Sequence, residues 1–196
     1  MSNIDNTSSN ENPPENDPRP KELRTPKSLL LVHTGHGKGK SSSAFGVMIR
    51  GVARDWKVGV VQFVKSGNWN VGEEKIGRQL GVDWFALGEG FTWDSQNLDQ
   101  DTQLGAQAWS KAQELLGSGI YDLLIFDELT YLLNWNWTET QPVIDALLKR
   151  PEHTSVVVTG RDAPQSLIDI ADTVTEMRNI KHAYESGFKA KRGIDY

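Results

Sequence analysis

The chain has 196 residues, 37% of them hydrophobic and 24% charged, a composition typical of one globular domain. Its net charge of −5 disfavours a large nucleic-acid footprint, and its lack of cysteine excludes disulfides, cysteine-ligated clusters and a thiol nucleophile. No apolar run approaches the length of a membrane span, and the N-terminus lacks the apolar core of a signal peptide. We therefore expect a cytoplasmic protein with neither a membrane nor a nucleic-acid partner.

The first 27 residues are predicted to form a disordered or conditionally ordered tail, followed by one domain over residues 28–196. Five of the eight prolines lie in this tail, and its only apolar side chains are those of Met1, Ile4 and Leu23. Such a segment cannot bury enough apolar surface to offset the entropy lost on ordering.

A phosphate-binding loop is predicted between Leu29 and Phe45. Four apolar residues indicate a buried strand, a glycine-rich turn follows, and Lys40 opens a segment with apolar residues at helical spacing. These are the parts of a P-loop, whose consensus is Gly-x-x-x-x-Gly-Lys-[Ser/Thr]. One departure stands out, because Thr34 occupies the place of the first consensus glycine and Gly35 lies one position late.

Each part of this loop suits a phosphate chain. Glycines let backbone N–H groups turn toward an anion, and the helix N-terminus adds positive potential. Lys40 supplies a full charge, and Ser41 offers a hydroxyl to magnesium. Lys38 either serves a long, highly charged phosphate chain or points into solvent, and His36 either touches phosphate or only occupies the turn.

Strands and helices alternate along the rest of the chain. Strands are predicted at 57–64, 82–87, 121–126, 154–159 and 172–177, and an irregular basic tail at 178–196. A short helix is expected at 73–80, and three more after an Asp99 or Asp101 cap, a Thr138–Gln141 capping box and an Asp162 cap. This order predicts an α/β fold with a mostly parallel sheet, whose ligands bind beyond the carboxyl ends of the strands. The P-loop, Lys65, the glycine-flanked loop at 88–93, Asp127–Glu128 and Arg161 all follow strands and should share that edge.

Two further groups are candidates for the site. Asp127 and Glu128 follow an apolar strand, where a P-loop protein places its metal-side carboxylate, and we expect Glu128 to contact the metal with Asp127 in support. Tryptophans in predicted loops form the second group, and they either anchor loops or a dimer contact, or form an apolar floor for a flat ligand: Trp69, Trp93, Trp135 and Trp137.

The segments TGHGKGKSS, VGVVQFVK, GFTW, LLIFDELTY, VVVTGR, ADTVTEMR and KHAYESGFKAKRGIDY occur in this order. Together they resemble the P-loop ATP:corrinoid adenosyltransferases, over residues 28–196. The resemblance implies a RecA-like P-loop fold and a homodimer. It also implies transfer of the 5′-deoxyadenosyl group of ATP to Co(I) of a corrinoid, assisted by Mg²⁺ or Mn²⁺, with triphosphate released, in adenosylcobalamin biosynthesis or corrinoid salvage.

The resemblance also assigns roles to residues. ATP would be bound by Gly35, His36, Gly37, Lys38, Gly39, Lys40, Ser41 and Ser42, and metal by Ser41, Glu128 and Asp127. Lys40, Phe91 and Trp93 would be catalytic, the two aromatics by displacing the lower axial ligand of Co(II) so that an external flavin or flavoprotein can reduce it. Many relatives have asparagine where His36 stands, and threonines where Ser41 and Ser42 stand. The alternative functions are a P-loop kinase or ATPase, and a RecA-like nucleotide-dependent binding module.

Overall fold

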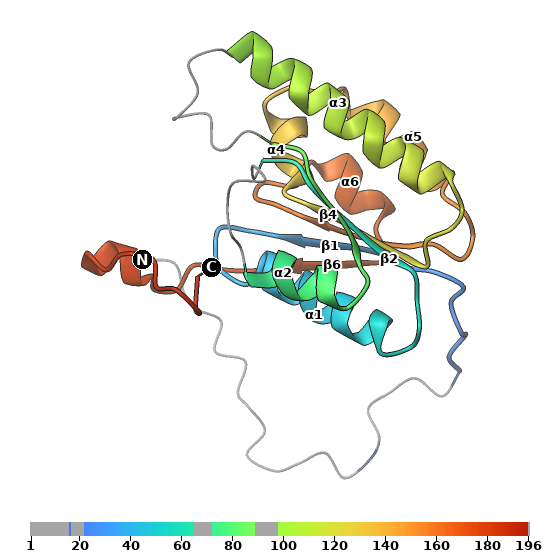
Figure 1. Cartoon of the computed structure of the whole chain (residues 1–196), viewed down its shortest axis with the longest axis horizontal. Coiled ribbons are helices and arrows are strands. Elements are labelled where there is room, and N and C mark those ends of the chain that lie inside the picture. The colour runs from blue at the N-terminus through green and yellow to red at the C-terminus, as the bar shows by residue number, and fades with distance from the viewer. Residues whose placement is uncertain (1–15, 17–21, 65–71, 89–97, 196) are drawn as a thin grey trace.

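A parallel sheet of six strands organises the molecule, in the order β3-β2-β4-β5-β1-β6 (Figure 1). The computed structural model describes residue 16 and residues 22–64, 72–88 and 98–195. The strands are β1 (Leu30–Thr34), β2 (Val58–Gln62), β3 (Asp83–Ala86), β4 (Leu123–Asp127), β5 (Ser155–Thr159) and β6 (Thr173–Glu176). All neighbouring strands among the described residues pair in parallel, which confirms the predicted α/β fold.

Helices cover both faces of this sheet (Figure 1). On one face lie α1 (Lys40–Val52) and α2 (Gly72–Gln79), and on the other α3 (Leu98–Gly117), α4 (Leu129–Asn134), α5 (Thr140–Leu148) and α6 (Gln165–Ile170). Each face has its own apolar core: Phe45 and Met48 of α1 pack on one side, and Trp109 of α3 with Leu147 of α5 on the other. The central strands are buried on both faces, which is why their sequences are continuously apolar.

The strand register brings the functional loops to one edge, as predicted. His33 of β1 lies opposite Thr159 of β5, and Gln62 of β2 lies opposite Asp127 of β4. The turns after β1, β4 and β5 therefore emerge side by side. Lys65, which was expected at the same edge, lies outside the described residues.

Three predicted helix starts are wrong. Helix α3 begins at Leu98, before either aspartate proposed as its cap. Helix α5 begins after Glu139, and Gln141 donates along the helix to Asp145 at 2.8 Å, so the Thr138–Gln141 pair forms no capping box. Helix α6 begins only after Pro164, because Asp162 adopts a left-handed φ of 50° and pairs with His36 instead.

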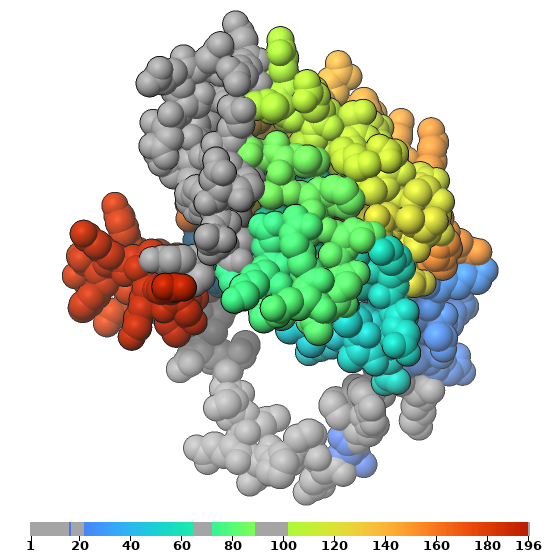
Figure 2. All heavy atoms as spheres, in the orientation of Figure 1, coloured from blue at the N-terminus to red at the C-terminus, as the bar shows by residue number. Residues whose placement is uncertain are grey.

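The last described residues, 178–195, form a segment that we call the C-terminal arm. It follows the edge strand β6, contains the short 3-10 helix η2 (Ala183–Ser186), and stands out from the body as a separate red lobe in Figure 2. Its large apolar side chains are mostly exposed: Ile180, Tyr184, Phe188 and Ile194. No helix among the described residues is long and apolar enough to cross a membrane.

Candidate functional site

The glycine-rich loop joins β1 to α1 and aims the helix N-terminus at the shared edge. Gly39 precedes the helix with a left-handed φ of 114°, and its carbonyl accepts the N–H of Ser43 at 2.8 Å. Nothing lies within 4 Å of a Cβ built on Gly39, so the requirement for glycine there is conformational. Lys40 is then the first helical residue, as the P-loop pattern predicts.

The backbone at the junction of β6 and the C-terminal arm, Met177 and Arg178, explains why the glycines depart from the consensus spacing. A Cβ on Gly35 would lie 2.5 Å from the Met177 carbonyl oxygen, and one on Gly37 would lie 2.6 Å from that of Arg178. Gly37 also donates its N–H to the Met177 carbonyl at 2.7 Å. Glycine is therefore needed at positions 35 and 37, because the backbone of Met177 and Arg178 leaves no room there for a side chain. Thr34, at the consensus glycine position, uses its hydroxyl to accept the N–H of Ala163 at 3.1 Å.

Lys40 is held within the loop. Its Nζ donates to the carbonyl of Gly37 at 2.7 Å, which directs the ammonium back over the turn. Burial lowers the pKa of Lys40, the nearby Arg161 lowers it further, and Glu128 opposes both. The loop therefore concentrates positive charge, a condition that an anionic ligand would relieve.

A cavity of about 470 Å³ opens over this loop. It is lined by Lys38, Gly39, Lys40, Ser41, Ser42, Glu73, Glu128, Tyr131, Trp135, Arg161, Ile194 and Asp195. We call it the phosphate cavity. Its lining contains Lys38 through Ser42 of the residues expected to bind ATP, and Glu128 of those expected to bind metal.

The two carboxylates at the end of β4, Asp127 as its last residue and Glu128 directly after it, have different surroundings. Asp127 is fully buried, and its two oxygens accept the Gln62 amide at 3.0 Å and the Thr159 hydroxyl at 2.8 Å. Glu128 has a left-handed φ of 67°, and it lines the phosphate cavity. This placement supports the predicted division between a metal-contacting Glu128 and a supporting Asp127, which stays a prediction.

Arg161 was expected at this edge of the sheet but was given no role, and it lines the phosphate cavity. A Cβ on the preceding Gly160 would lie 1.9 Å from the Thr130 hydroxyl, so the turn after β5 packs tightly on α4. The Arg161 carbonyl accepts the Thr130 hydroxyl at 2.6 Å and the Asn134 amide at 3.1 Å. These bonds fix the turn that presents Arg161 to the cavity. A Gly-Arg pair directly after a strand of a P-loop sheet is the signal that could have identified it.

His36 and Lys38 both have carboxylate partners. His36 Nε2 lies 3.0 Å from Asp162 Oδ1, which links the phosphate loop to the turn after β5. Lys38 forms an ion pair with Asp195 at the end of the C-terminal arm. Lys38 therefore does not simply point into solvent, because its ammonium group pairs with the Asp195 carboxylate.

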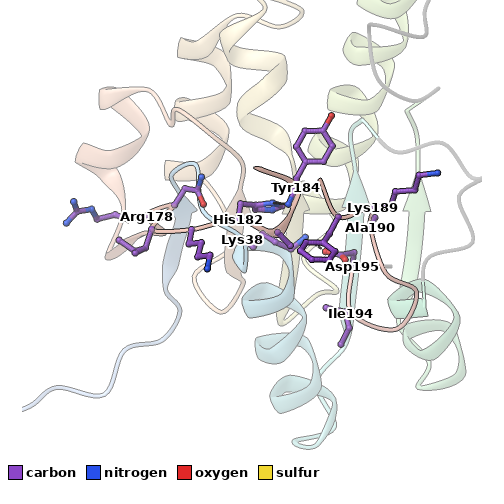
Figure 3. Close-up of a pocket in the computed structure, with 13 residues that line it drawn as sticks. Lys38, Arg178, His182, Tyr184, Lys189, Ala190, Ile194 and Asp195 are labelled. Carbon is purple, nitrogen blue, oxygen red and sulfur yellow. Dashed lines mark hydrogen bonds and ion pairs between the residues drawn. The ribbon is translucent and has the colours of Figure 1, made fainter. Parts of the chain in front are cut away.

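A second cavity, of about 960 Å³, lies within the C-terminal arm. Figure 3 shows Lys38 of the phosphate loop beside side chains of the arm that include His182, Tyr184 and Asp195. Both cavities are lined by Lys38, Ile194 and Asp195. The ion pair therefore stands between them. We call this second space the arm cavity.

A parallel α/β sheet with a glycine-rich loop, a lysine at the following helix start and a carboxylate pair after β4 defines a P-loop nucleotide-binding protein. Residues 26–196 match the family model "ATP:corrinoid adenosyltransferase BtuR/CobO/CobP", and the chain belongs to this family.

Curated relatives agree with this assignment. The corrinoid adenosyltransferase of Escherichia coli (strain K12) is 39% identical over 180 residues, spanning 92% of this chain and 91% of the relative. That of Pseudomonas aeruginosa is 42% identical over 177 residues, spanning 89% and 87%. The resemblance seen in the sequence motifs is thus confirmed, and the kinase, ATPase and RecA-like binding alternatives are not favoured.

The two predicted aromatic catalytic residues, Phe91 and Trp93, lie outside the described residues, as does Trp69. Their roles stay predictions. Trp135 and Trp137 are described: Trp135 lines the phosphate cavity, whereas Trp137 packs against the core of α3 and α4. Trp137 therefore fits the anchoring alternative, and the ligand-floor role stays a prediction for Trp135.

Proposed function

We propose that the protein transfers the 5′-deoxyadenosyl group of ATP to the Co(I) centre of a corrinoid and releases inorganic triphosphate. The observation that carries this proposal is the phosphate cavity, which gathers the cationic groups of Lys38, Lys40 and Arg161 in a chain of this family. Arginine and lysine side chains together suit a chain of linked phosphates.

This reaction needs no base from the protein, because its nucleophile, Co(I), carries no proton that must be removed. The electron pair of Co(I) attacks C5′, a cobalt–carbon bond forms, and the bond between C5′ and the phosphate oxygen breaks. The electron pair of that bond leaves with the triphosphate, and cobalt becomes Co(III). The protein's contribution at the leaving group would be electrostatic, because Lys40 and Arg161 both line the cavity that would hold the phosphates.

A divalent cation fits the carboxylate side of this cavity. Ser41 and Glu128 bring a hydroxyl and a carboxylate to its lining, and oxygen donors of this kind suit Mg²⁺ or Mn²⁺. When bound, the ion would neutralise charge on the phosphate oxygens. Asp127 would support the site from below through its bonds to Gln62 and Thr159.

Other parts of the proposal extend beyond the described site. Electrons for Co(II) reduction would come from an external flavin or flavoprotein, since the chain has no cysteine with which to build a redox centre of its own. Phe91 and Trp93 would form the wedge that removes the lower cobalt ligand. We further propose a cytoplasmic homodimer in which residues 1–27 contribute nothing to the domain core.

Phosphorus NMR of a complete reaction mixture tests this function. With ATP and a chemically reduced corrinoid, triphosphate should appear in the same amount as the new cobalt–carbon bond. The Lys40→Ala variant is the matched control and should form much less of both at the same ATP concentration. ADP and orthophosphate in the absence of corrinoid would show that the γ-phosphate is cut instead, and would overturn the proposal.

A further inference from the structure

The end of the C-terminal arm is joined to the phosphate loop by one ion pair. Lys38 Nζ donates to Asp195 Oδ1 (Figure 3). The other Asp195 oxygen accepts the N–H of Lys191 at 2.7 Å, so a turn of the arm itself holds the carboxylate. The Lys191 N–H and the Lys38 ammonium keep the pKa of Asp195 below its usual value. Asp195 is therefore a carboxylate at neutral pH, held by the arm and aimed at the loop.

Little else attaches this end of the arm. Within the described part of the chain, no other hydrogen bond or ion pair joins residues 179–195 to the body. The base of the arm is fixed separately, because the Met177 carbonyl accepts the Gly37 N–H at 2.7 Å. A segment held mainly by one exposed ion pair leaves the body at a small cost in free energy. Its large apolar side chains add little, since they are 65–77% exposed: Ile180, Tyr184, Phe188 and Ile194.

Asp195 lies where it competes with a phosphate chain for Lys38. Lys38, Ile194 and Asp195 line both the phosphate cavity and the arm cavity. A phosphate chain in the first cavity would attract the Lys38 ammonium and repel the Asp195 carboxylate. Because triphosphate carries several negative charges and Asp195 carries one, the ligand is the stronger partner for Lys38.

We propose that the Lys38–Asp195 pair is an ionic lock, which a polyphosphate opens by taking Lys38 from Asp195. Opening releases the end of the arm, residues 191–195, from the phosphate loop. Since Ile194 and Asp195 line both cavities, their release joins the phosphate cavity to the arm cavity. Binding in one cavity is thereby coupled to access to the other. The inference rests on the proposed function only in requiring that the phosphate cavity accept a phosphate chain.

A static ion pair is the competing explanation, in which Lys40 and Arg161 alone would hold the phosphates. The exposure of Lys38 favours the lock, because its side chain is 56% exposed and can turn toward the phosphate cavity without leaving a buried partner. Lys40, in contrast, is tied within the loop by its bond to the Gly37 carbonyl. Lys38 is thus the loop cation that is able to change partners.

A distance measurement between two spin labels tests whether the arm is released. The chain has no cysteine, so Arg54→Cys after α1 and Arg192→Cys in the arm, both at exposed positions, can be labelled specifically. Pulsed EPR should show a shifted and broader label distance when inorganic triphosphate is added. Sodium chloride at the same ionic strength should not reproduce the change, which separates it from screening. With Asp195→Asn added, the released distance should appear without triphosphate.

Calorimetry with inorganic triphosphate tests the exchange of partners. Asp195→Asn removes the charge but keeps an oxygen for the Lys191 N–H, and it should tighten triphosphate binding roughly 1.5- to 5-fold, the range expected for breaking an exposed ion pair. In a Lys38→Met background this gain should shrink, because no pair is left to break. The matched control is Glu152→Gln, which breaks the exposed Lys27–Glu152 pair outside both cavities and should leave the affinity unchanged.

Three results would overturn the lock. One is an unchanged label distance in protein that calorimetry shows to be saturated with triphosphate. Another is an equal gain in affinity from Asp195→Asn with and without Lys38, because the carboxylate would then only repel the ligand. The third is a failure to bind triphosphate at all, which would also remove the phosphate site of the proposed function. Failure of adenosyl transfer alone is distinct, since inorganic triphosphate contains no group to transfer.

Discussion

Replacing Gln62 with leucine should destabilise the fold substantially, because its side chain joins two buried partners. The Gln62 amide donates to the buried Asp127 carboxylate at 3.0 Å, and its carbonyl accepts the Trp84 indole N–H at 2.9 Å. Gln62 is 1% exposed and Asp127 is fully buried. A hydrogen bond to a charged group contributes about 1.5–3 kcal/mol, and a neutral one about 0.5–1.5 kcal/mol. The leucine variant should therefore lose about 2–4 kcal/mol.

Urea unfolding followed by tryptophan fluorescence measures this loss. For a domain of this size, about 2–4 kcal/mol corresponds to a drop in Tm of roughly 5–15 °C. Thr159→Val is a parallel test of the same buried carboxylate. It removes the donor to the other Asp127 oxygen and should also lower the free energy of unfolding. A loss below about 1 kcal/mol in Gln62→Leu, with an unchanged m-value, would refute the reasoning that this amide stabilises the buried carboxylate.

The remaining predictions concern the site, the pH dependence of stability, and the residues Phe91 and Trp93. Lys40→Ala should weaken ATP binding by about 1.5–3 kcal/mol, roughly 10- to 150-fold, because a charge-assisted contact is lost; unchanged affinity in calorimetry would contradict the phosphate site. Burial, with help from the bond to Asp83, raises the pKa of Tyr121 to about 12 from 10.0, so the stability it adds is complete below pH 10 and is lost as the pH rises through about 12. Melting curves of Tyr121→Phe should therefore approach those of the unchanged protein over this interval, and a constant gap would count against it. Replacing Phe91 and Trp93 with alanine should cripple turnover from Co(II) corrinoid and largely spare turnover from Co(I); equal losses from both would remove the wedge assignment.

The fold could be predicted because its signals are local. Buried parallel strands are continuously apolar, and glycine-rich turns separate them from amphipathic helices, so the sheet and its ligand edge follow from the order of the elements. The helix starts were less predictable. Aspartate is a common N-cap residue, which made Asp162 a candidate cap. Its carboxylate instead pairs with His36, and this pairing depends on the packing of two turns that are distant in the sequence.

The site was only partly predictable for a related reason. Lys40, Ser41 and Glu128 belong to sequence patterns and line the phosphate cavity as expected. Tyr131 belongs to no such pattern, and the position of Arg161 after a strand predicted its edge but not its contact with the cavity. Both line the cavity where α4 packs on the turn after β5. The displaced glycine, Gly35, likewise has its reason in Met177, which is far away in the sequence.

The most direct test of the central claim is anaerobic incubation of the protein with ATP, a divalent cation and a corrinoid reduced to Co(I), followed by absorbance spectroscopy. We expect a cobalt–carbon bond to form at a rate that depends on ATP, with one triphosphate released for each bond. Persistence of the Co(I) spectrum in the presence of folded, ATP-bound protein would contradict it.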